Sequence, residues 1–218
     1  MKQNRMKTLG GIVVLVCMLL AMPLTGLAAP PQPFTDVPEN AWFAEDVRFV
    51  SESGLMNGTA EGHFAPAQTV TRAQMATILH RMAGEPISIY NQHLIDVAFY
   101  AWYAEAVFWS FQTELMDMVG YRRFGPEEQM TREGAALVLF RFAAYQEIDT
   151  AVSDSGNLDQ FDDRDQISDW AETAMDWAVY HDLLRGVSPA TLAPDQTLDR
   201  AQTAALIHRF IRTFEIVL

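Results

Sequence analysis

The sequence is short of cysteine, of basic residues and of long apolar runs. Its one cysteine, Cys17, lies in an N-terminal apolar segment, so the rest of the chain can form neither a disulfide nor a thiolate metal site. Lysine and arginine together number 15 against 28 aspartates and glutamates, which gives a formal net charge of −13. Because so acidic a surface repels nucleic acid and anionic lipid, we expect neither as a partner.

The sequence also lacks the short motifs that mark common catalytic sites. It contains no Gly-x-Ser-x-Gly, no His-Glu-x-x-His and no P-loop, and no cysteine is placed as a nucleophile. Paired carboxylates are frequent, but in a chain this acidic they carry no information. We therefore predict that the protein is not an enzyme and uses no cofactor.

Residues 1–28 are predicted to be a signal peptide. Lys2, Arg5 and Lys7 precede an apolar run at 9–22, which is too short for a confident membrane span, and Ala28 precedes the expected cleavage site. Cleavage there leaves about 190 residues with 12 basic and 28 acidic side chains, a net charge of −16. We expect no membrane insertion after cleavage; an uncleaved anchor is the alternative.

One spacing recurs three times along the remainder of the chain. Trp, Leu, Pro and Arg stand at offsets 0, 13, 24 and 30, and the copies start 60 and 68 residues apart. A period of this size indicates one supersecondary unit used repeatedly. The three sets are Trp42–Leu55–Pro66–Arg72, Trp102–Leu115–Pro126–Arg132 and Trp170–Leu183–Pro194–Arg200.

Each copy is predicted to fold as helix, loop and helix. The first helix follows the Trp, and the second opens with a capping box at Thr71/Gln74 and at Asp199/Gln202, whereas the middle copy has Gly134 at the reciprocal position. Apolar residues then recur at helical spacing, so each second helix needs partners to bury its stripe. We assign repeat 1 to residues 33–84, repeat 2 to 93–145, an acidic linker to 146–159 and repeat 3 to 160–213. A solenoid-like stack and a closed pseudo-threefold cluster both satisfy this pattern.

Two groups of residues have the composition of metal ligands but not the arrangement. His80 and His208 occupy one repeat position, where the middle copy has Phe140, so packing explains them better than metal binding. The acidic run at 154–169 lacks the residue order and the closing Glu of a calcium loop, which indicates a solvated linker. No metal site is expected.

The motifs in these copies resemble the S-layer homology (SLH) family. Phe34-Thr-Asp-Val37 is similar to the family's F-x-D-V start, and Val70-Thr-Arg-Ala-Gln74 is similar to its T-R-A-E sequence. The resemblance covers three tandem repeats. It implies a mainly all-α fold in which three helix-loop-helix repeats form a compact pseudo-threefold trimer with a central three-helix bundle. It also implies binding to the secondary cell-wall polymer of Gram-positive-type bacteria, a peptidoglycan-linked glycan that is often pyruvylated.

The copies depart from the family pattern to different degrees. The final Glu of the motif is Gln74, Gly134 and Gln202, and the middle copy also has Met118 where repeat 1 has the loop glycine Gly58. Sites that use repeats 1 and 3 therefore match the family better than one built on repeat 2.

The motif residues have two readings. The first-turn arginines work against the helix dipole, so they either bind a carboxylate together with the exposed N–H groups of the helix start, or pair with the Asp of their own repeat. The tryptophans either stack on sugar or, as we favour, pack in the core. Trp109 and Trp177, inside the first helices, are predicted to be packing residues.

These arguments predict a secreted, non-catalytic protein of the cell wall or S-layer that binds an anionic wall polysaccharide. The alternative is an adaptor that recruits other cell-surface proteins, which an exposed apolar patch outside the equivalent grooves would favour; a secreted hydrolase is a distant third. The predicted ligand-binding residues are Asp36, Trp42, Arg72, Gln74, Asp96, Trp102, Arg132, Asp163, Trp170, Arg200 and Gln202.

Overall fold

The computed structural model describes residues 34–88, 94–152 and 156–218, so the predicted signal peptide lies outside the described residues. The described residues all belong to one unit of the chain. That unit is helical and contains no strand within the described ranges. Its elements are α1 (Ala44–Glu52), α2 (Arg72–Met82), α3 (Ala104–Gln112), α4 (Arg132–Tyr145), two 3-10 turns η1 (Asn157–Gln160) and η2 (Arg164–Gln166), α5 (Glu172–Tyr180) and α6 (Arg200–Thr213).

The local signals place the helices as predicted. α1, α3 and α5 are nine residues long and each begins two residues after the repeat's tryptophan. Both capping boxes are present: Thr71 and Asp199 accept the N3 backbone N–H, and the N3 glutamine accepts the cap's own N–H in return. At α4 only the bond from Gly134 N to Thr131 is made, because glycine has no side chain to reach back.

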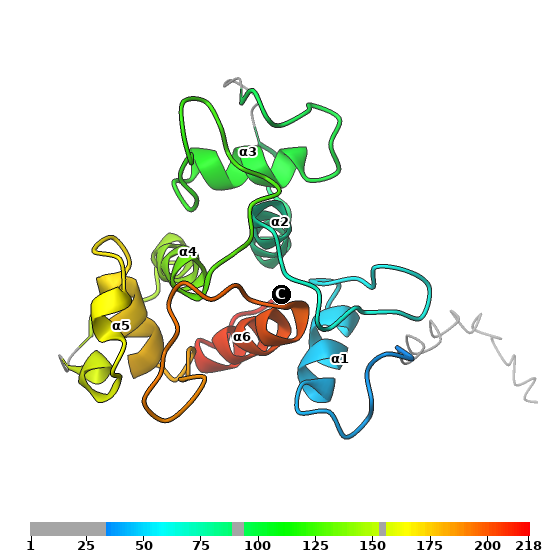
Figure 1. Cartoon of the computed structure of the whole chain (residues 1–218). Helices are drawn as coiled ribbons and strands as arrows, with labels where there is room; N and C mark the ends of the chain where they lie inside the picture. The colour runs from blue at the N-terminus through cyan, green and yellow to red at the C-terminus, as the bar shows by residue number, and fades with distance from the viewer. Residues whose placement is uncertain (1–33, 89–93, 153–155) are drawn as a thin grey trace, which may run out of the picture. The chain divides into compact units, whose positions relative to one another are not determined.

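The three helix pairs close into a ring. The second helix of each repeat packs against the first helix of the next, as α2 with α3, α4 with α5, and α6 with α1. In Figure 1 α2, α4 and α6 surround the centre and α1, α3 and α5 lie outside them. Three backbone bonds join the repeats in a cycle: Val70 N to Leu198 O, Leu198 N to Met130 O, and Met130 N to Val70 O. Because the third repeat bonds back to the first, the structure is a closed cluster and not an open stack.

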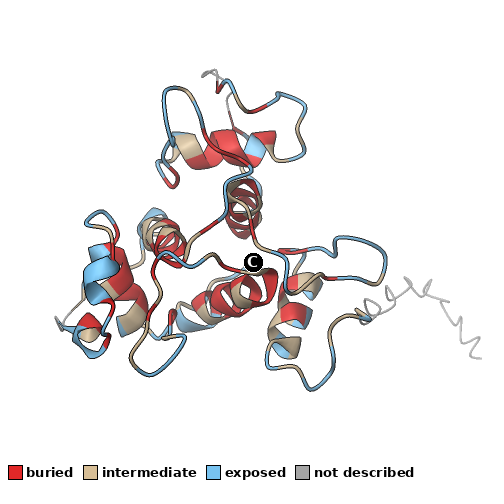
Figure 2. Cartoon of the chain, in the orientation of Figure 1, coloured by how far each residue is buried: buried red, intermediate tan, exposed pale blue. Residues whose placement is uncertain are grey.

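The core is continuous across these interfaces. The loop residues Phe64, Phe124 and Leu192 are fully buried, and Phe142 of α4 meets Phe210 of α6 with ring centroids 5.9 Å apart. Figure 2 shows buried residues on the helix faces that turn towards each other and exposed residues on the loops. Trp109 and Trp177 are buried, which confirms their predicted packing role.

The acidic run at 154–169 is described from residue 156 onwards, and this part differs from a solvated linker. Its acids are mostly exposed, but Leu158, Phe161 and Ile167 are buried, and η1 packs on α5. An apolar residue every few positions anchors the segment to the core. The high content of acidic residues led us to overlook this spacing in the sequence. In the part of the chain that is described, no group of three potential ligands could hold a metal ion, and no helix is long and apolar enough to cross a membrane.

Candidate functional site

The repeated arginine of each second helix binds the loop of the following repeat. Arg200, at the start of α6, donates from Nε to the carbonyl of Phe64 at 2.7 Å and from Nη2 to that of Asn57 at 2.6 Å. Its guanidinium also lies 4.4 Å from the centroid of the Phe64 ring. Equivalent bonds run from Arg72 to the carbonyls of Phe124 and Asp117, and from Arg132 to those of Leu192 and Arg185.

The repeated aspartates have a different partner from the one predicted. Asp36 accepts backbone bonds from Phe64 and Ala65 of its own repeat at 2.9 and 2.7 Å, and Asp96 and Asp163 do the same in theirs. These bonds hold the loop where its carbonyls meet the arginine of the preceding repeat. The alternative in which each Arg pairs with the Asp of its own repeat is therefore wrong, because the arginine reaches forward to the neighbouring loop.

The first N–H groups of the second helices are not open to an anion. At α6 the backbone N–H of Arg200 donates to Gln68 O at 2.9 Å, and that of Ala201 donates to Pro66 O at 3.0 Å. The starts of α2 and α4 bond equally to the loops of repeats 2 and 3. The prediction that these groups form a carboxylate receptor is wrong, because the ring closure uses them.

Burial sets the electrostatics of this network. It lowers the pKa of the Arg200 guanidinium, and the carboxylate of Asp36 partly opposes that shift. Burial would raise the pKa of Asp36, but the N–H groups of Phe64 and Ala65 outweigh it, and the pKa lies below its usual value. The pKa of Asp163 is lowered in the same way by Leu192 and Ala193. Both carboxylates are thus held in the charged form by backbone donors.

The ring closure creates a groove between repeats 1 and 2, which we call groove 1. It has a volume of about 400 Å³, within the range of small-ligand sites. The loop and second helix of repeat 1 form its walls, Trp102 comes from repeat 2, and Arg200 comes from repeat 3. Its lining is Leu55, Met56, Asn57, Gly58, Thr59, Val70, Gln74, Thr77, Ile78, Arg81, Trp102 and Arg200.

The charged residues that line groove 1 are both cations, although the protein is acidic. No carboxylate is among its lining residues, whereas Arg81 and Arg200 both are. Arg81 was missed at the sequence level, although an arginine stands nine places after the first one in every copy, as Arg81, Arg141 and Arg209. Its side chain is 27% exposed and bonds the carbonyl of Leu55, which holds it at the groove wall. Its Nε also lies 3.9 Å from the carboxylate of Glu85, which is outside the groove lining.

The tryptophans of the repeat are at the surface. Trp42, Trp102 and Trp170 are 65%, 68% and 56% exposed, so the favoured core position is wrong. Each stands just before a helix that begins two residues later, and the core is filled by the helix residues instead. Trp102 therefore presents an indole face to groove 1 that can stack on a sugar ring.

Groove 2 lies at the equivalent place between repeats 2 and 3. It is lined by Arg72, Leu115, Met116, Asp117, Met118, Val119, Gly134, Leu137, Val138, Arg141 and Trp170, and its volume of about 380 Å³ matches groove 1. Asp117 replaces Asn57 and pairs with Arg141 at 2.8 Å. Met118, Val119 and Leu137 replace Gly58, Thr59 and Thr77, so this groove is more apolar and its exposed cation is neutralised.

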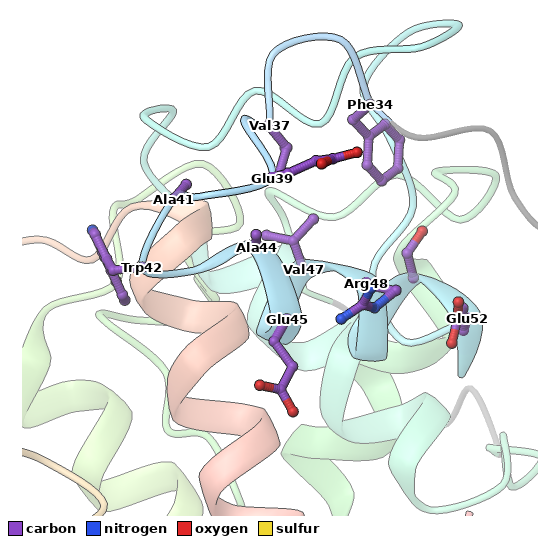
Figure 3. A pocket seen from close by; sticks show the side chains of 11 residues that line it. Phe34, Val37, Glu39, Ala41, Trp42, Ala44, Glu45, Val47, Arg48 and Glu52 are labelled. Atoms are coloured by element: carbon purple, nitrogen blue, oxygen red, sulfur yellow. The ribbon is translucent and has the colours of Figure 1, made fainter.

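A third hollow, on repeat 1, lies between the segment before α1 and α1 itself (Figure 3). Its volume is about 700 Å³, but its charged lining is Glu39, Glu45, Glu52 and Arg48, a net negative set. Trp42 lies at its rim in Figure 3. An anionic ligand is repelled by three carboxylates, so this hollow does not compete with groove 1 for one.

Of the predicted site residues, groove 1 unites Gln74, Trp102 and Arg200, and groove 2 unites Arg72 and Trp170. Asp36, Asp96, Asp163 and Arg132 lie in the network between the repeats instead. Gln202 completes the cap of α6, and Trp42 is exposed before α1.

Comparison with known proteins finds similarity to one domain family in two parts of the chain. The family model for the S-layer homology domain matches residues 33–76 and 160–204. The chain is 27% identical over 201 residues to a cellulosome-anchoring protein of Acetivibrio thermocellus, covering 86% of this chain and 40% of that protein. It is 27% identical over 174 residues to the surface-layer 125 kDa protein of Lysinibacillus sphaericus, covering 78% and 14%.

An exoglucanase of Acetivibrio thermocellus is also similar, at 24% identity over 191 residues that cover 88% of this chain and 17% of the enzyme. The chain spans less than half the length of each of these three relatives. What they share with it is therefore one part of proteins that differ elsewhere.

Proposed function

The chain carries S-layer homology domains at residues 33–76 and 160–204, and from this premise we propose that it is a cell-surface anchoring module that binds an anionic wall polysaccharide in groove 1. Similarity to a cellulosome-anchoring protein and to a surface-layer protein supports the anchoring role. We propose further that the protein is secreted, non-catalytic and held at the wall of a Gram-positive-type bacterium. Residues 93–145 then form a divergent middle copy of the same domain.

The observation that carries the ligand class is the charge of groove 1. Its lining includes two arginines and no carboxylate, in a chain with a net charge of −13. A sugar acid or a pyruvyl ketal places a carboxylate beside a ring, and the lining of groove 1 contains both a cation, Arg81, and an exposed indole, Trp102. Asn57, Thr59 and Gln74 add neutral polar groups for hydroxyls.

The contribution of each predicted residue differs in this proposal. Gln74 and Trp102 contact the glycan directly, together with Arg81. Arg200 is buried and commits two of its nitrogen atoms to carbonyls, so its main role is to shape the groove. The aspartates hold the loops and act on the ligand only through them.

The deciding experiment is sedimentation of the protein with purified cell walls, with and without the secondary polymer. We expect binding to intact walls only, and a loss of at least about tenfold in affinity for Arg81→Gln or Trp102→Ala. Arg212→Gln and Tyr100→Ala are matched controls, because both side chains are exposed and absent from the groove lining. Equal binding to stripped walls would show that the polymer is not the ligand.

A second candidate function, an adaptor for another surface protein, is favoured by one observation. Ile95 and Tyr121 of repeat 2 are 66% and 85% exposed, and a backbone bond from Ile95 N to Arg122 O brings their segments together. The equivalent residues of repeat 1 are Thr35 and Glu61. If the adaptor function holds, Ile95→Thr with Tyr121→Glu abolishes partner recruitment while wall binding stays unchanged; loss of wall binding instead would assign the patch to the glycan.

A further inference from the structure

Grooves 1 and 2 have the same size and position but different chemistry. Each takes its walls from one repeat, its tryptophan from the next and its first-turn arginine from the one before, and their volumes are about 400 and 380 Å³. Arg200 of groove 1 is buried and Arg72 of groove 2 is half-buried. Groove 2 therefore keeps both the volume of groove 1 and an exposed tryptophan in its lining. What changes is the set of groups that a ligand meets once it is stacked on the indole.

The changes in groove 2 remove the means of recognising an anion. Asp117 is part of the lining and pairs with Arg141 at 2.8 Å, whereas the carboxylate nearest Arg81 in groove 1, that of Glu85, is 3.9 Å away and outside the lining. Arg72 donates from Nε to Phe124 O at 3.0 Å and from Nη2 to Asp117 O at 2.5 Å. A ligand carboxylate placed here would lie beside Asp117 and would have to displace it.

The same changes add apolar surface next to the tryptophan. Met118 and Val119 are 41% and 44% exposed, and Leu137 replaces a threonine on the helix wall. Gly134 leaves open the place that Gln74 fills in groove 1. Burial of a methyl group against these side chains is favourable, at about 25 cal/mol per Å² of apolar area removed from water.

We propose that groove 2 is a binding site for a neutral acetamido sugar. The pyranose stacks on Trp170, the acetamido methyl contacts Met118 and Leu137, and the Asp117–Arg141 pair accepts and donates hydrogen bonds to hydroxyls. This inference rests on the proposed function in taking the ligand to be a glycan. Groove 1 would then bind an acidic sugar and groove 2 a neutral sugar, so that one polymer containing both kinds of sugar is held at two points.

The test uses the indole N–H signals of Trp102 and Trp170 in nuclear magnetic resonance spectra, assigned with Trp→Phe variants. The neutral probe is tri-N-acetylchitotriose and the acidic probe is a trimer of galacturonic acid, each at millimolar concentration. We expect the neutral probe to shift the Trp170 signal and the acidic probe to shift that of Trp102. An unmoved Trp170 signal with the neutral probe overturns the inference.

A variant that introduces three groove 1 residues into groove 2 makes the test specific. Asp117→Asn, Met118→Gly and Gly134→Gln together introduce the residues of repeat 1, so the fold already accommodates them in the same unit. We expect the affinity of groove 2 for the neutral probe to fall at least about tenfold, and we expect the acidic probe to begin to shift the Trp170 signal. Ile95→Thr, outside the groove, is the control that should change neither response.

Failure of this inference and failure of the proposed function give different results. If Trp102 ignores the acidic probe and the protein ignores cell walls, the proposed function is wrong, whatever Trp170 does. If walls are bound but Trp170 responds to neither sugar, the assignment of groove 2 alone is wrong. A neutral-sugar response that survives in the triple variant also overturns it, because the altered side chains would then not contact the sugar.

Discussion

The guanidinium of Arg200 lies over the ring of Phe64, 4.4 Å from its centroid, although 136 residues separate them in the chain. This contact joins the third repeat to the first. Its backbone counterpart, Leu198 O accepting from Val70 N at 2.9 Å, lies two residues before the same arginine. The main role of Arg200 is therefore to close the ring, and the closed ring is what places Arg200 in the lining of groove 1.

We expect Arg200→Ala to lower the free energy of unfolding by about 3 kcal/mol, because it leaves the carbonyls of Phe64 and Asn57 without their charged donor. Arg200→Lys should recover only part of the loss, since an ammonium cannot span both carbonyls as the planar guanidinium does. Urea denaturation measures both. The exposed Arg212→Ala should change stability by less than about 0.5 kcal/mol. If Arg200→Ala is as stable as the wild type, Arg200 does not stabilise the closed ring.

Acid should destabilise the protein through Asp36 and Asp163, whose pKa values lie below the usual 3.8. Because the folded-state pKa is the lower one, each charged carboxylate stabilises the fold above the unfolded value, and that stability disappears as pH falls through the folded value. Thermal unfolding followed from pH 7 towards strong acid should show most of the loss below about pH 4. In Asp36→Asn with Asp163→Asn the slope should be smaller; an unchanged slope would assign the acid sensitivity to other groups.

Gly134→Gln should stabilise the protein by about 1 kcal/mol, because it replaces a helical glycine and completes the capping box that Thr131 begins. A Cβ at this position would lie 3.0 Å from Thr131 Oγ1 and 3.2 Å from Met130 Sδ, both side-chain atoms that can adjust. The same Thr and Gln pair exists at α2. Calorimetry should show a higher melting temperature, and Gln74→Gly should show the reverse. A lower melting temperature for Gly134→Gln would mean that the crowding outweighs the cap.

The interface that closes the ring contains a polar pair absent from the other two. His208 Nδ1 of α6 lies 2.7 Å from Asp46 Oδ1 of α1, and its ring stacks on Phe49. The equivalent residues are His80 and Ala106 where α2 packs on α3, and Phe140 and Ala174 where α4 packs on α5. Removing one partner leaves the other part-buried and unpaired, whereas removing both need not.

We therefore expect Asp46→Ala alone to cost about 1 to 2 kcal/mol and the double variant His208→Phe with Asp46→Ala to be closer to wild type. Denaturant unfolding of the two single variants and the double variant gives the coupling energy. Additive losses would show that the pair contributes nothing beyond its separate contacts.

The features that could be predicted from the sequence are those set by interactions between residues close together in the chain. The helix starts at Thr71 and Asp199 were predictable because a capping box involves residues three apart in the chain. The apolar stripes of α2, α4 and α6 were predictable because helical periodicity is local. The exposed tryptophans were not, because the same indole can be core or surface depending on which helix covers it.

The sequence by itself determined the repetition, the two helices of each copy and their capped ends, since these depend on neighbours within one turn or one period. The order in which the copies contact one another was decided only by the tertiary structure. The ring closure turned Arg72, Arg132 and Arg200 away from the aspartates of their own repeats and towards the next loop. It also assembled each groove from three repeats, so that in groove 1 Trp102 of repeat 2 and Arg200 of repeat 3 lie beside walls that belong to repeat 1. No pairing of that kind is visible along the chain, because it depends on which surfaces the closed ring brings together.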